Sequence, residues 1–499
     1  WPGAAGETPP GVAPGGAVAA GRRLHPAVMG LWPLGQVGPI LLLLLAGPLA
    51  PVVAITLLLA SAAASVVRYL RFSWKVADGA LVIEQGLLQR QRRVIPLERV
   101  QSVDLVRKVR HRLLGVVEVR VEAVGGDSTE GRLDALSVAD GQRLRDMLLR
   151  ERDRAAGQPV DAPAAATAHA GAPARPLARL GPDRLVVAGL TGGRVGVAAA
   201  LLGFAQQIFG ERVDELLQRA PALLGARGIV AVVLITLVGA FVLSIVATVV
   251  AYWNFTLTRE GSNLRIHRGL LEQRSDTLPL RRVQAVRVEE NIVRRLLGLA
   301  AVKVDVAGRS GGEGRDTGTL LPLGRRSEAF ALVARVLDTE SLARVELAGM
   351  PLRARNRRVV RALVPVAVLT VAAFVAFHAV GLLALLLAVP AVAVALGSYR
   401  ALGHAQLDDF VVARSGLLVR RTAFVPTARL QSLALTANPV QRWRRLATLD
   451  LQIARSPGVW SGPQLIDLDA GTGHDLLGEL AAIVVSGRAG LPPALTGRG

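Results

Sequence analysis

The sequence has no cysteine, only three lysines and few aromatic residues. In a chain of 499 residues, the absence of cysteine excludes disulfide bonds, thiolate nucleophiles and cysteine-ligated zinc or iron–sulfur sites. The lysines are outnumbered by arginines among 59 basic residues, and the formal net charge is +21. Aromatic residues make up 4% of the chain, too few for the stacking platforms that single-stranded nucleic acids use. We therefore expect no nucleic-acid partner.

Motifs for catalysis and for metal or nucleotide binding are also missing. The seven histidines are spread along the chain, and no two have the spacing of metal ligands. The sequence contains no HExxH, no phosphate-binding loop and no GxSxG. We predict no catalytic residue, no cofactor and no metal, and a protein that is not an enzyme.

Charge, in contrast, is absent from three long stretches. Leu24–Val67, Gly228–Thr258 and Ala362–Tyr399 contain no Asp, Glu, Lys or Arg. One membrane-spanning helix needs about 20 apolar residues. The stretches predict six spans, arranged as a transmembrane hairpin over residues 31–67, a pair over 185–252 and a hairpin over 359–398. The first helix of the middle pair is the weakest, because Arg194 interrupts it.

Arginine clusters lie at one end of these predicted spans. Arg68 and Arg71 follow the first pair, Arg259 follows the second and Arg400 follows the third, whereas the turns near Pro48 and His378 lack basic residues. Cytoplasmic loops carry the excess of basic residues. We therefore expect a multi-pass protein of the cell membrane with both termini and all long polar segments in the cytoplasm.

Three polar segments, residues 72–152, 253–339 and 399–487, contain the same signature at constant spacing. The recurring residues are Gly86, Pro96, Arg99 and Gln101, then Gly269, Pro279, Arg282 and Gln284, then Gly416, Pro426, Arg429 and Gln431. Constant spacing over so many matches indicates an internal repeat. The rest of the chain reads as a disordered tail over 1–23, a flexible linker over 153–183 and a tail over 488–499.

The pattern within each repeat is mostly that of strands. Apolar and polar residues alternate from Val117, Val302 and Leu449. A short helix is predicted to end at Gly115 and again at Gly298. A final amphipathic helix is predicted over residues 138–150, 327–337 and 473–485. Several strands and one C-terminal helix predict a small half-open barrel or sandwich.

These motifs resemble the bacterial membrane-flanked PH-like domain family, of the YdbS/YdbT type. The resemblance rests on Gly-Leu-Leu, Ile-Pro-Leu-x-Arg-Val-Gln-Ser-Val and Arg-x-Leu-Leu-Gly, and it covers nearly the whole chain. The third repeat departs from it, with Trp443-Arg444-Arg445 in place of Leu-Leu-Gly and Thr427 in place of leucine. The resemblance implies an α-helical membrane protein with three α+β PH-like domains, each a bent antiparallel barrel with a C-terminal helix and each preceded by a transmembrane helix pair. Such folds serve as lipid-binding or protein-binding modules, and the fold alone does not settle which.

Two sets of residues are candidates for a functional site. Arg99 and Gln101 lie at i and i+2, on one face of a strand, and could contact a lipid phosphate or a partner. Hydrogen bonding to backbone groups near the proline is the interpretation we favour for these signature residues. The second set consists of basic clusters, either membrane-surface contacts or a solvated face enriched by codon usage: Arg90, Arg92, Arg93, Arg107, Lys108, Arg110, Arg112, Arg294, Arg295, Arg442, Arg444 and Arg445.

The leading hypothesis is a membrane scaffold whose domains bind the membrane surface, each other or an unidentified protein partner. Near an anionic leaflet each basic residue can gain about 1 kcal/mol, so anionic lipids are candidate partners. The family resemblance implies a setting in envelope stress or tolerance of antimicrobial peptides. The alternative is a component that handles or transports a lipid or another hydrophobic substrate.

Overall fold

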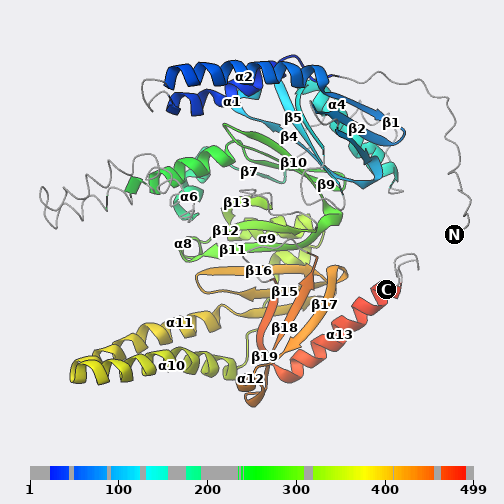
Figure 1. Cartoon of the computed structure of the whole chain (residues 1–499). Coiled ribbons are helices and arrows are strands. Elements are labelled where there is room, and N and C mark those ends of the chain that lie inside the picture. Colours follow the sequence, from blue (N-terminus) through cyan, green and yellow to red (C-terminus); the bar gives the residue numbers. More distant parts are fainter. Residues whose placement is uncertain are drawn as a thin grey trace, which may run out of the picture. The chain divides into compact units, whose positions relative to one another are not determined.

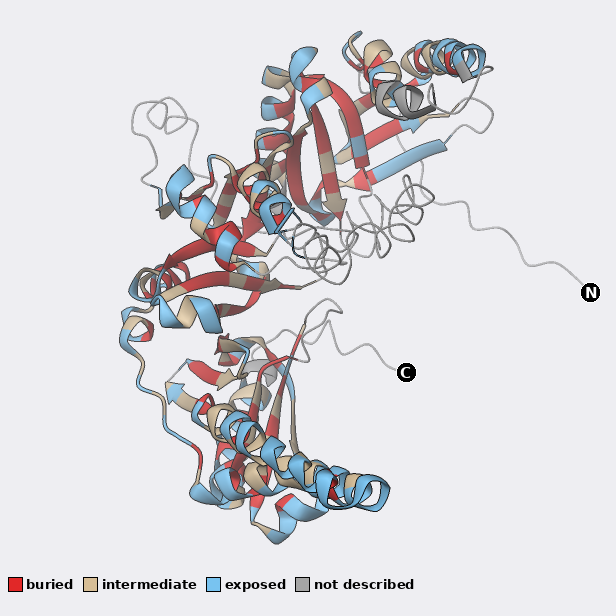
Figure 2. Cartoon of the chain, turned by 90° about the vertical axis from the view of Figure 1, so that its left-hand side faces the viewer, coloured by how far each residue is buried: buried red, intermediate tan, exposed pale blue. Residues whose placement is uncertain are grey.

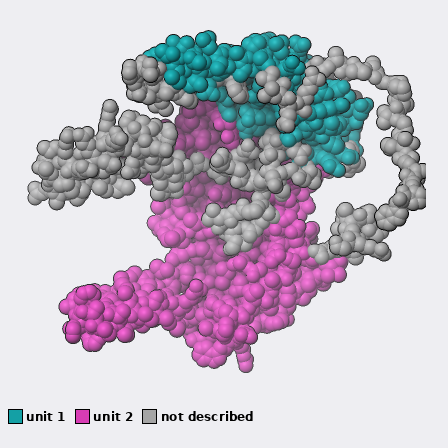
Figure 3. Space-filling view, viewed as in Figure 1, with its two compact units in different colours: residues 1–162 teal, residues 163–499 magenta. Residues whose placement is uncertain are grey.

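The structure, a computed structural model, describes residues 23–43, 50–86, 91–123, 131–155, 176–192, 234, 238–239, 241–307, 318–407, 409–454 and 462–489. The chain divides into two compact units, Trp1–Ala162 and Pro163–Gly499 (Figure 3). The first unit contains the first repeat, and the second unit contains the other two.

Each repeat folds into a domain in which two antiparallel sets of three strands precede a helix (Figure 1). In the first domain, the first sheet pairs β1 with β2 and β2 with β3, and the second pairs β4 with β5 and β5 with β6. The elements are β1 (Ser73–Ala77), β2 (Ala80–Gln85), β3 (Gln91–Pro96), β4 (Val100–Arg107), α3 (Val109–Leu113), β5 (Val116–Ala123), β6 (Gly131–Ser137) and α4 (Val138–Ala155).

The second and third domains repeat this order of elements. The second comprises β8 (Thr256–Glu260), β9 (Asn263–Arg268), β10 (Gln273–Pro279), β11 (Val283–Asn291), α8 (Ile292–Leu296), β12 (Leu299–Val306), β13 (Thr319–Arg325) and α9 (Arg326–Val336). The third comprises β14 (Gly403–Leu407), β15 (Phe410–Ser415), β16 (Val419–Pro426), β17 (Leu430–Thr436), α12 (Pro439–Trp443), β18 (Leu446–Ile453), β19 (Gln464–Asp469) and α13 (Ala470–Ala489).

The repeated signature forms the corner between the two sheets of each domain. The strand ends at the proline, a single 3-10 turn follows over Leu97–Arg99, Leu280–Arg282 or Thr427–Arg429, and the next strand then begins. The register shifts between Val100 and Ser102, and at the matching positions of the other domains. Each shift falls on the signature glutamine, so Gln101, Gln284 and Gln431 occupy β-bulges, which bend a strand. The signature is therefore a folded corner.

The second and third domains share one sheet. Strand β11 pairs with β12 on one side and with β16 of the third domain on the other, giving the order β13-β12-β11-β16-β15-β14. Phe424 of β16 is fully buried, and its ring packs edge-on against Phe330 of α9 at 5.7 Å between centroids. The core of the second domain therefore includes side chains of the third.

Two described segments are long and apolar enough to cross a membrane by length and composition, Pro51–Arg71 within α2 (Ala50–Arg71) and Leu352–Arg400. The second segment consists of α10 (Leu352–Phe377), the 3-10 segment η4 (His378–Leu387) and α11 (Ala388–Arg400). Helix α11 packs back along α10, so the two form a hairpin. Figure 2 shows this hairpin largely exposed, whereas the strands are mostly buried.

The remaining predicted spans are described only in part. Helix α1 (Val28–Leu43) precedes α2, and a shorter apolar helix covers Phe241–Tyr252. Residues 193–233, where Arg194 and most of the middle pair fall, lie outside the described residues. A transmembrane pair before each domain therefore stays a prediction.

The predicted linker over 153–183 differs from the structure at both ends. Helix α4 continues to Ala155, and Ala178–Arg179 form β7, which pairs with β8. Leu180 is buried in the core of the second domain, and α6 (Pro182–Thr191) follows it. Leu180 packs into this core and anchors the chain. The residues just before Asp183 are therefore held in place, although their Ala/Pro-rich composition predicted a flexible linker.

Candidate membrane-facing site

A five-residue helix in each domain exposes large apolar side chains. We call α3, α8 and α12 the tip helices. Leu113, Leu296 and Trp443, at the ends of these helices, are 74%, 81% and 78% exposed. They occupy the same place in the three domains, between the fourth and fifth strands. One exposed leucine means little, but the same exposure at three matching places indicates a surface that meets an apolar environment.

Arginines surround the exposed apolar groups. Arg112 of α3 and Arg442 of α12 are exposed, and Arg295 of α8 is half-buried. The guanidinium of Arg444 lies 5.0 Å from the centre of the Trp443 ring, a cation–π contact. Apolar groups beside arginine and tryptophan are typical of proteins that bind the bilayer interface.

The tip helices lie beside the helices that precede their domains. In the first domain, the guanidinium of Arg110 lies against Gly35 of α1, and Leu114 packs on Gly30. In the second, Arg294 donates from Nε to Thr191 Oγ1 of α6 at 3.1 Å. In the third, α12 and α10 both donate to the buried carboxylate of Asp467. Each tip is therefore placed by the chain segment that leads toward a predicted span.

The third tip helix ends in the same conformation as the other two despite its different sequence. Gly115 and Gly298 have φ of 67° and 66°, and Arg445, which replaces the glycine, has φ of 52°. The carbonyls of Gly298 and Arg445 both accept the amide that begins the C-terminal helix of their domain. The departure at Trp443-Arg444-Arg445 therefore changes the side chains but not the turn.

The left-handed backbone of Arg445 predicts the direction of two stability changes. Arg445→Gly should raise the free energy of unfolding by about 1 kcal/mol, because a left-handed L-residue costs about 1–2 kcal/mol and glycine relieves it. Gly298→Ala should lower the free energy of unfolding by about 1 kcal/mol. An added Cβ meets nothing within 4 Å, so the cost comes only from the positive φ.

Urea unfolding of the detergent-purified full chain measures both effects. Arg442→Gly, placed inside α12, is the matched control and should destabilise by about 1 kcal/mol. If Arg445→Gly lowered the free energy of unfolding instead, the contacts of the arginine side chain would stabilise the fold by more than its left-handed backbone costs.

Not all basic-cluster residues face outward. Lys108 reaches within 4.0 Å of Glu118, a fully buried carboxylate that also binds Arg120 and Arg132. These three cations outweigh burial, which acts in the opposite direction, and hold the pKa of Glu118 below its usual range. Arg107 and Arg294 are likewise half-buried, and burial lowers the pKa of Arg294. Arg92 and Arg93 are exposed on β3, and Arg90 lies outside the described residues.

A buried histidine lies within the first tip helix. His111 is 2% exposed, and its Nδ1 has no hydrogen-bond partner. Burial lowers the pKa of His111, and Arg110 and Lys108 act in the same direction against Glu118, which raises it. The folded chain therefore favours neutral His111.

We expect the first domain to lose stability as the pH falls below 6.5, the ordinary pKa of histidine. The folded-state pKa of His111 is lowered, so its stabilisation is complete above 6.5 and is lost as the pH falls toward the folded value. Hydrogen exchange of peptides from α3 and β5 in the full chain between pH 7.5 and 5.5 measures this. His111→Gln should remove the dependence, and an equal acid response in both proteins would contradict the assignment.

Some signature residues of the corner bond to the backbone or are buried, whereas others are exposed, so a structural role for the whole set stays a prediction. Arg282 donates from Nη2 to the Ala307 carbonyl at 2.7 Å and from Nε at 3.2 Å, and Gln284 is buried. Gly86, Gly269 and Gly416 have φ of 119°, 104° and 96°. A Cβ at Gly416 would lie 2.1 Å from the Val419 carbonyl oxygen, so a side chain is excluded there. Arg99 is exposed and Arg429 half-buried.

A buried aspartate anchors the hairpin α10–α11 to the third domain. Asp467 of β19 has no exposed surface and φ of 62°. It accepts from Arg357, from Arg358 Nε at 3.0 Å and from Gln441 Nε2 of α12 at 2.9 Å. Arg358 also donates to Ser398 of α11 at 3.3 Å. The carboxylate thus joins α10 to the tip helix, and Arg358 links α11 to the same group.

A second set of ion pairs holds the shared sheet between the second and third domains. Glu290 accepts from Nε and Nη2 of Arg420, both at 2.8 Å. Its neighbour Glu289 accepts from Arg421 Nε at 3.3 Å and contacts Lys303 Nζ at 2.9 Å. Burial acts to raise the pKa of Glu289, but Lys303, Arg287 and Arg421 outweigh it and hold this pKa low. Both pairs cross the β11–β16 junction.

Sequence reasoning missed three parts of this arrangement: the exposed apolar tips, the Asp467 anchor and the Glu290–Arg420 junction. The sequence contains a signal for the tips. In the first two repeats, two leucines stand between arginines and the glycine that ends the helix, and this pattern places apolar groups at a charged surface. The anchor and the junction join residues more than 100 positions apart, and local patterns carry no trace of such pairings.

Comparisons with known proteins agree with the repeat. Residues 33–152, 197–340 and 364–483 each match the bacterial PH domain family. The chain is 25% identical over 407 residues to the UPF0699 transmembrane protein YdbT of Bacillus subtilis (strain 168), covering 79% of this chain and 82% of that protein. No solved structure matches the chain. With three matches that together span more than half of its length, the chain belongs to the bacterial PH domain family.

Proposed function

We propose that this protein is a multi-pass membrane scaffold whose cytoplasmic PH-like domains bind the membrane surface and each other. The observation that carries the proposal is the exposed apolar end of the tip helix, present in all three domains beside arginines. YdbT, a relative of similar length, is named as a transmembrane protein, which supports the membrane assignment. The apolar segments Pro51–Arg71 and Leu352–Arg400 support it as well.

The energetics favour tip insertion. Moving a leucine or tryptophan side chain from water into the interface is worth about 1.5–3 kcal/mol when burial is complete. A nearby arginine adds about 1 kcal/mol at an anionic leaflet. A single tip would bind a membrane weakly, but the domains are already tethered, so each tip needs only a small gain to stay inserted.

The shared sheet supports binding of the domains to each other. Strands β11 and β16 pair over six residues and bury both Glu290 and Phe424. A rigid junction of this kind suits a scaffold, since it fixes the spacing of two membrane-facing tips. The physiological setting that the family resemblance implies, tolerance of envelope stress or antimicrobial peptides, belongs to the same proposal.

The absence of cysteine makes a direct test possible. Leu296→Cys and Trp443→Cys each create a unique thiol, which can carry an environment-sensitive fluorophore in the full chain. In nanodiscs containing phosphatidylglycerol, we expect a blue-shifted emission and protection from aqueous quenchers at both positions. The matched controls are Glu340→Cys and Ser486→Cys, both exposed; Glu340 begins the 3-10 helix Glu340–Arg344 after α9, and Ser486 lies near the end of α13. Equal quenching at tip and control positions would show that the tips stay in water.

A further inference from the structure

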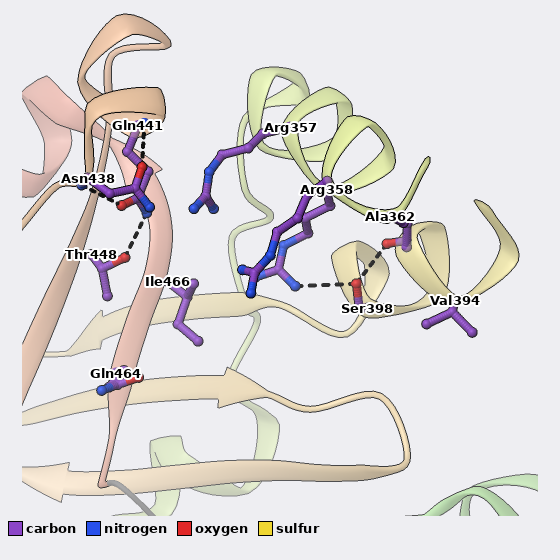
Figure 4. A pocket seen from close by; sticks show the side chains of 12 residues that line it. Arg357, Arg358, Ala362, Val394, Ser398, Asn438, Gln441, Thr448, Gln464 and Ile466 are labelled. Carbon is purple, nitrogen blue, oxygen red and sulfur yellow. Dashed lines mark hydrogen bonds between the residues drawn. The ribbon is translucent and has the colours of Figure 1, made fainter. Parts of the chain in front are cut away.

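A cavity of about 520 Å³ opens between hairpin α10–α11 and the third domain. Figure 4 shows its lining side chains, which come from both helices of the hairpin, from α12 and from the strands. Arg357, Arg358 and Arg361 of α10 lie on one wall. The cavity therefore brings three guanidinium groups into one space at the base of the hairpin.

The positive charge of this cavity is only partly balanced. No carboxylate is among its lining residues, and Asp467, behind the wall, neutralises Arg357 and Arg358 together. Arg361 is exposed and makes no hydrogen bond or ion pair with any residue that the structure describes. About two positive charges are left for a ligand, and paired arginines bind phosphate oxygens in a forked geometry.

The rest of the lining is amphipathic. Ala362 and Val394, on the two helices, give apolar surface on the hairpin side. Asn438, Thr448 and Gln464 give amide and hydroxyl groups on the domain side. Arg361 is also the last charged residue before the charge-free segment Ala362–Tyr399. If the hairpin crosses the membrane, as the proposed function holds, the cavity lies at the level of the lipid headgroups.

The second domain has a cavity near its own tip helix, but this lining includes a carboxylate, and both of its basic groups have partners within the chain. That cavity, of about 250 Å³, is lined by Arg294, Lys303 and Glu289 among others. Glu289 binds Lys303 at 2.9 Å, and Arg294 is bound to Thr191. The second domain therefore lacks the unbalanced set of three arginines that lines the cavity of the third.

We propose that the cavity at the base of hairpin α10–α11 binds the phosphate of an anionic membrane phospholipid, with Arg358 and Arg361 as the phosphate ligands. The polar wall would hold the headgroup, and the apolar wall would meet the start of the acyl chains. This inference rests on the proposed function for its membrane setting, and it names the ligand class of one specific site.

The test measures binding of short-chain lipids to the detergent-purified full chain by titration calorimetry. The probes are dihexanoyl phosphatidylglycerol, dihexanoyl phosphatidylcholine and inorganic phosphate. We expect phosphatidylglycerol to bind about ten-fold or more tightly than phosphatidylcholine, and Arg361→Gln to weaken it by about ten-fold or more, as for loss of one charged hydrogen-bonding group. Arg361→Lys should retain part of the affinity, because it keeps the charge but loses the fork.

Arg355→Gln is the matched control, since Arg355 is exposed on the same helix but does not line the cavity. Arg361 has no intramolecular partner among the described residues, so its replacement should leave folding intact. The proposal is overturned if Arg361→Gln binds phosphatidylglycerol like the parent chain, or if the two lipids bind equally. Inorganic phosphate binding as tightly as phosphatidylglycerol would assign the cavity to a free anion instead.

The two proposals fail in distinguishable ways. The titration takes place in detergent solution and does not require the tips to enter a membrane. Loss of the fluorophore shift with intact lipid binding would overturn tip insertion alone. A normal fluorophore shift without selective binding of phosphatidylglycerol would overturn only the proposal that the cavity binds a phospholipid.

Discussion

Glu290→Ala should lower the free energy of unfolding by about 3–5 kcal/mol, the cost expected when one partner of a buried ion pair is removed. Glu290 is 1% exposed and holds Arg420 with both oxygens. Alanine would leave the Arg420 guanidinium enclosed without its counter-charge. Because the pair lies on opposed residues of β11 and β16, the loss should fall on the junction of the two domains.

Hydrogen exchange in the full chain locates this effect. We expect the amides of β11 and β16 to exchange faster together, because local opening of a shared sheet exposes both strands. Glu272→Ala is the control: it removes a half-buried pair with Arg274 at 3.1 Å, within one domain, and should cost no more than about 1 kcal/mol. The double replacement Glu290→Leu with Arg420→Met should recover much of the stability, since replacing a buried pair by apolar groups is often neutral. Equal effects of Glu290→Ala and Glu272→Ala would show that the junction does not depend on this pair.

Asp467→Asn should cost a similar amount, about 3–5 kcal/mol, but at the base of hairpin α10–α11. Asparagine tolerates the left-handed backbone that Asp467 adopts and keeps the size of the side chain, so only the charge is removed. Arg357, which is 9% exposed, would then be enclosed without a counter-charge. The hairpin, α12 and β19 should loosen as a group, because Asp467 joins all three.

Thermal unfolding of the detergent-purified chain and hydrogen exchange over residues 352–361 would measure this. Asp469→Asn removes the more exposed pair with Arg353 and should have an effect of about 1 kcal/mol or less. Adding Arg357→Met to Asp467→Asn should recover part of the loss, because it removes the enclosed charge. A full-sized defect that Arg357→Met leaves unchanged would place the role of Asp467 elsewhere, for example in its contact with Gln441.

The repeat was predictable from the sequence because its signature is local. Glycine, proline, arginine and glutamine recur at fixed spacing, and each marks a backbone event: a positive φ at Gly416, a strand end at Pro426 and a bulge at Gln431. The corner itself was not predicted. The 3-10 turn between the two strands has only three residues. This interruption of the alternating pattern is too short to mark a corner in the sequence.

The junction and the cavity depend on long-range pairing, which periodicity does not encode. Glu290 and Arg420 lie 130 residues apart, and Glu289 and Arg421 lie 132 apart, so in the sequence each charge looks like ordinary surface charge. In the sequence, the arginines of α10 form a basic run before a predicted span, a pattern that indicates only membrane orientation. Their convergence on Asp467 depends on how β19 packs against the hairpin, which follows from tertiary structure alone. Arg294 shows the same limit: its sequence neighbours suggest an exposed cation, yet it packs on Thr191.

The pairing of β11 with β16 has a consequence for how such chains change length in evolution. It joins the fourth strand of one repeat to the third strand of the next, and every repeat supplies both kinds of strand. A duplicated repeat would therefore arrive with a ready-made joint, and a deleted one would leave compatible edges behind. Tandem duplication could vary the number of domains without requiring a new interface, while ion pairs such as Glu290–Arg420 specialise particular joints afterwards.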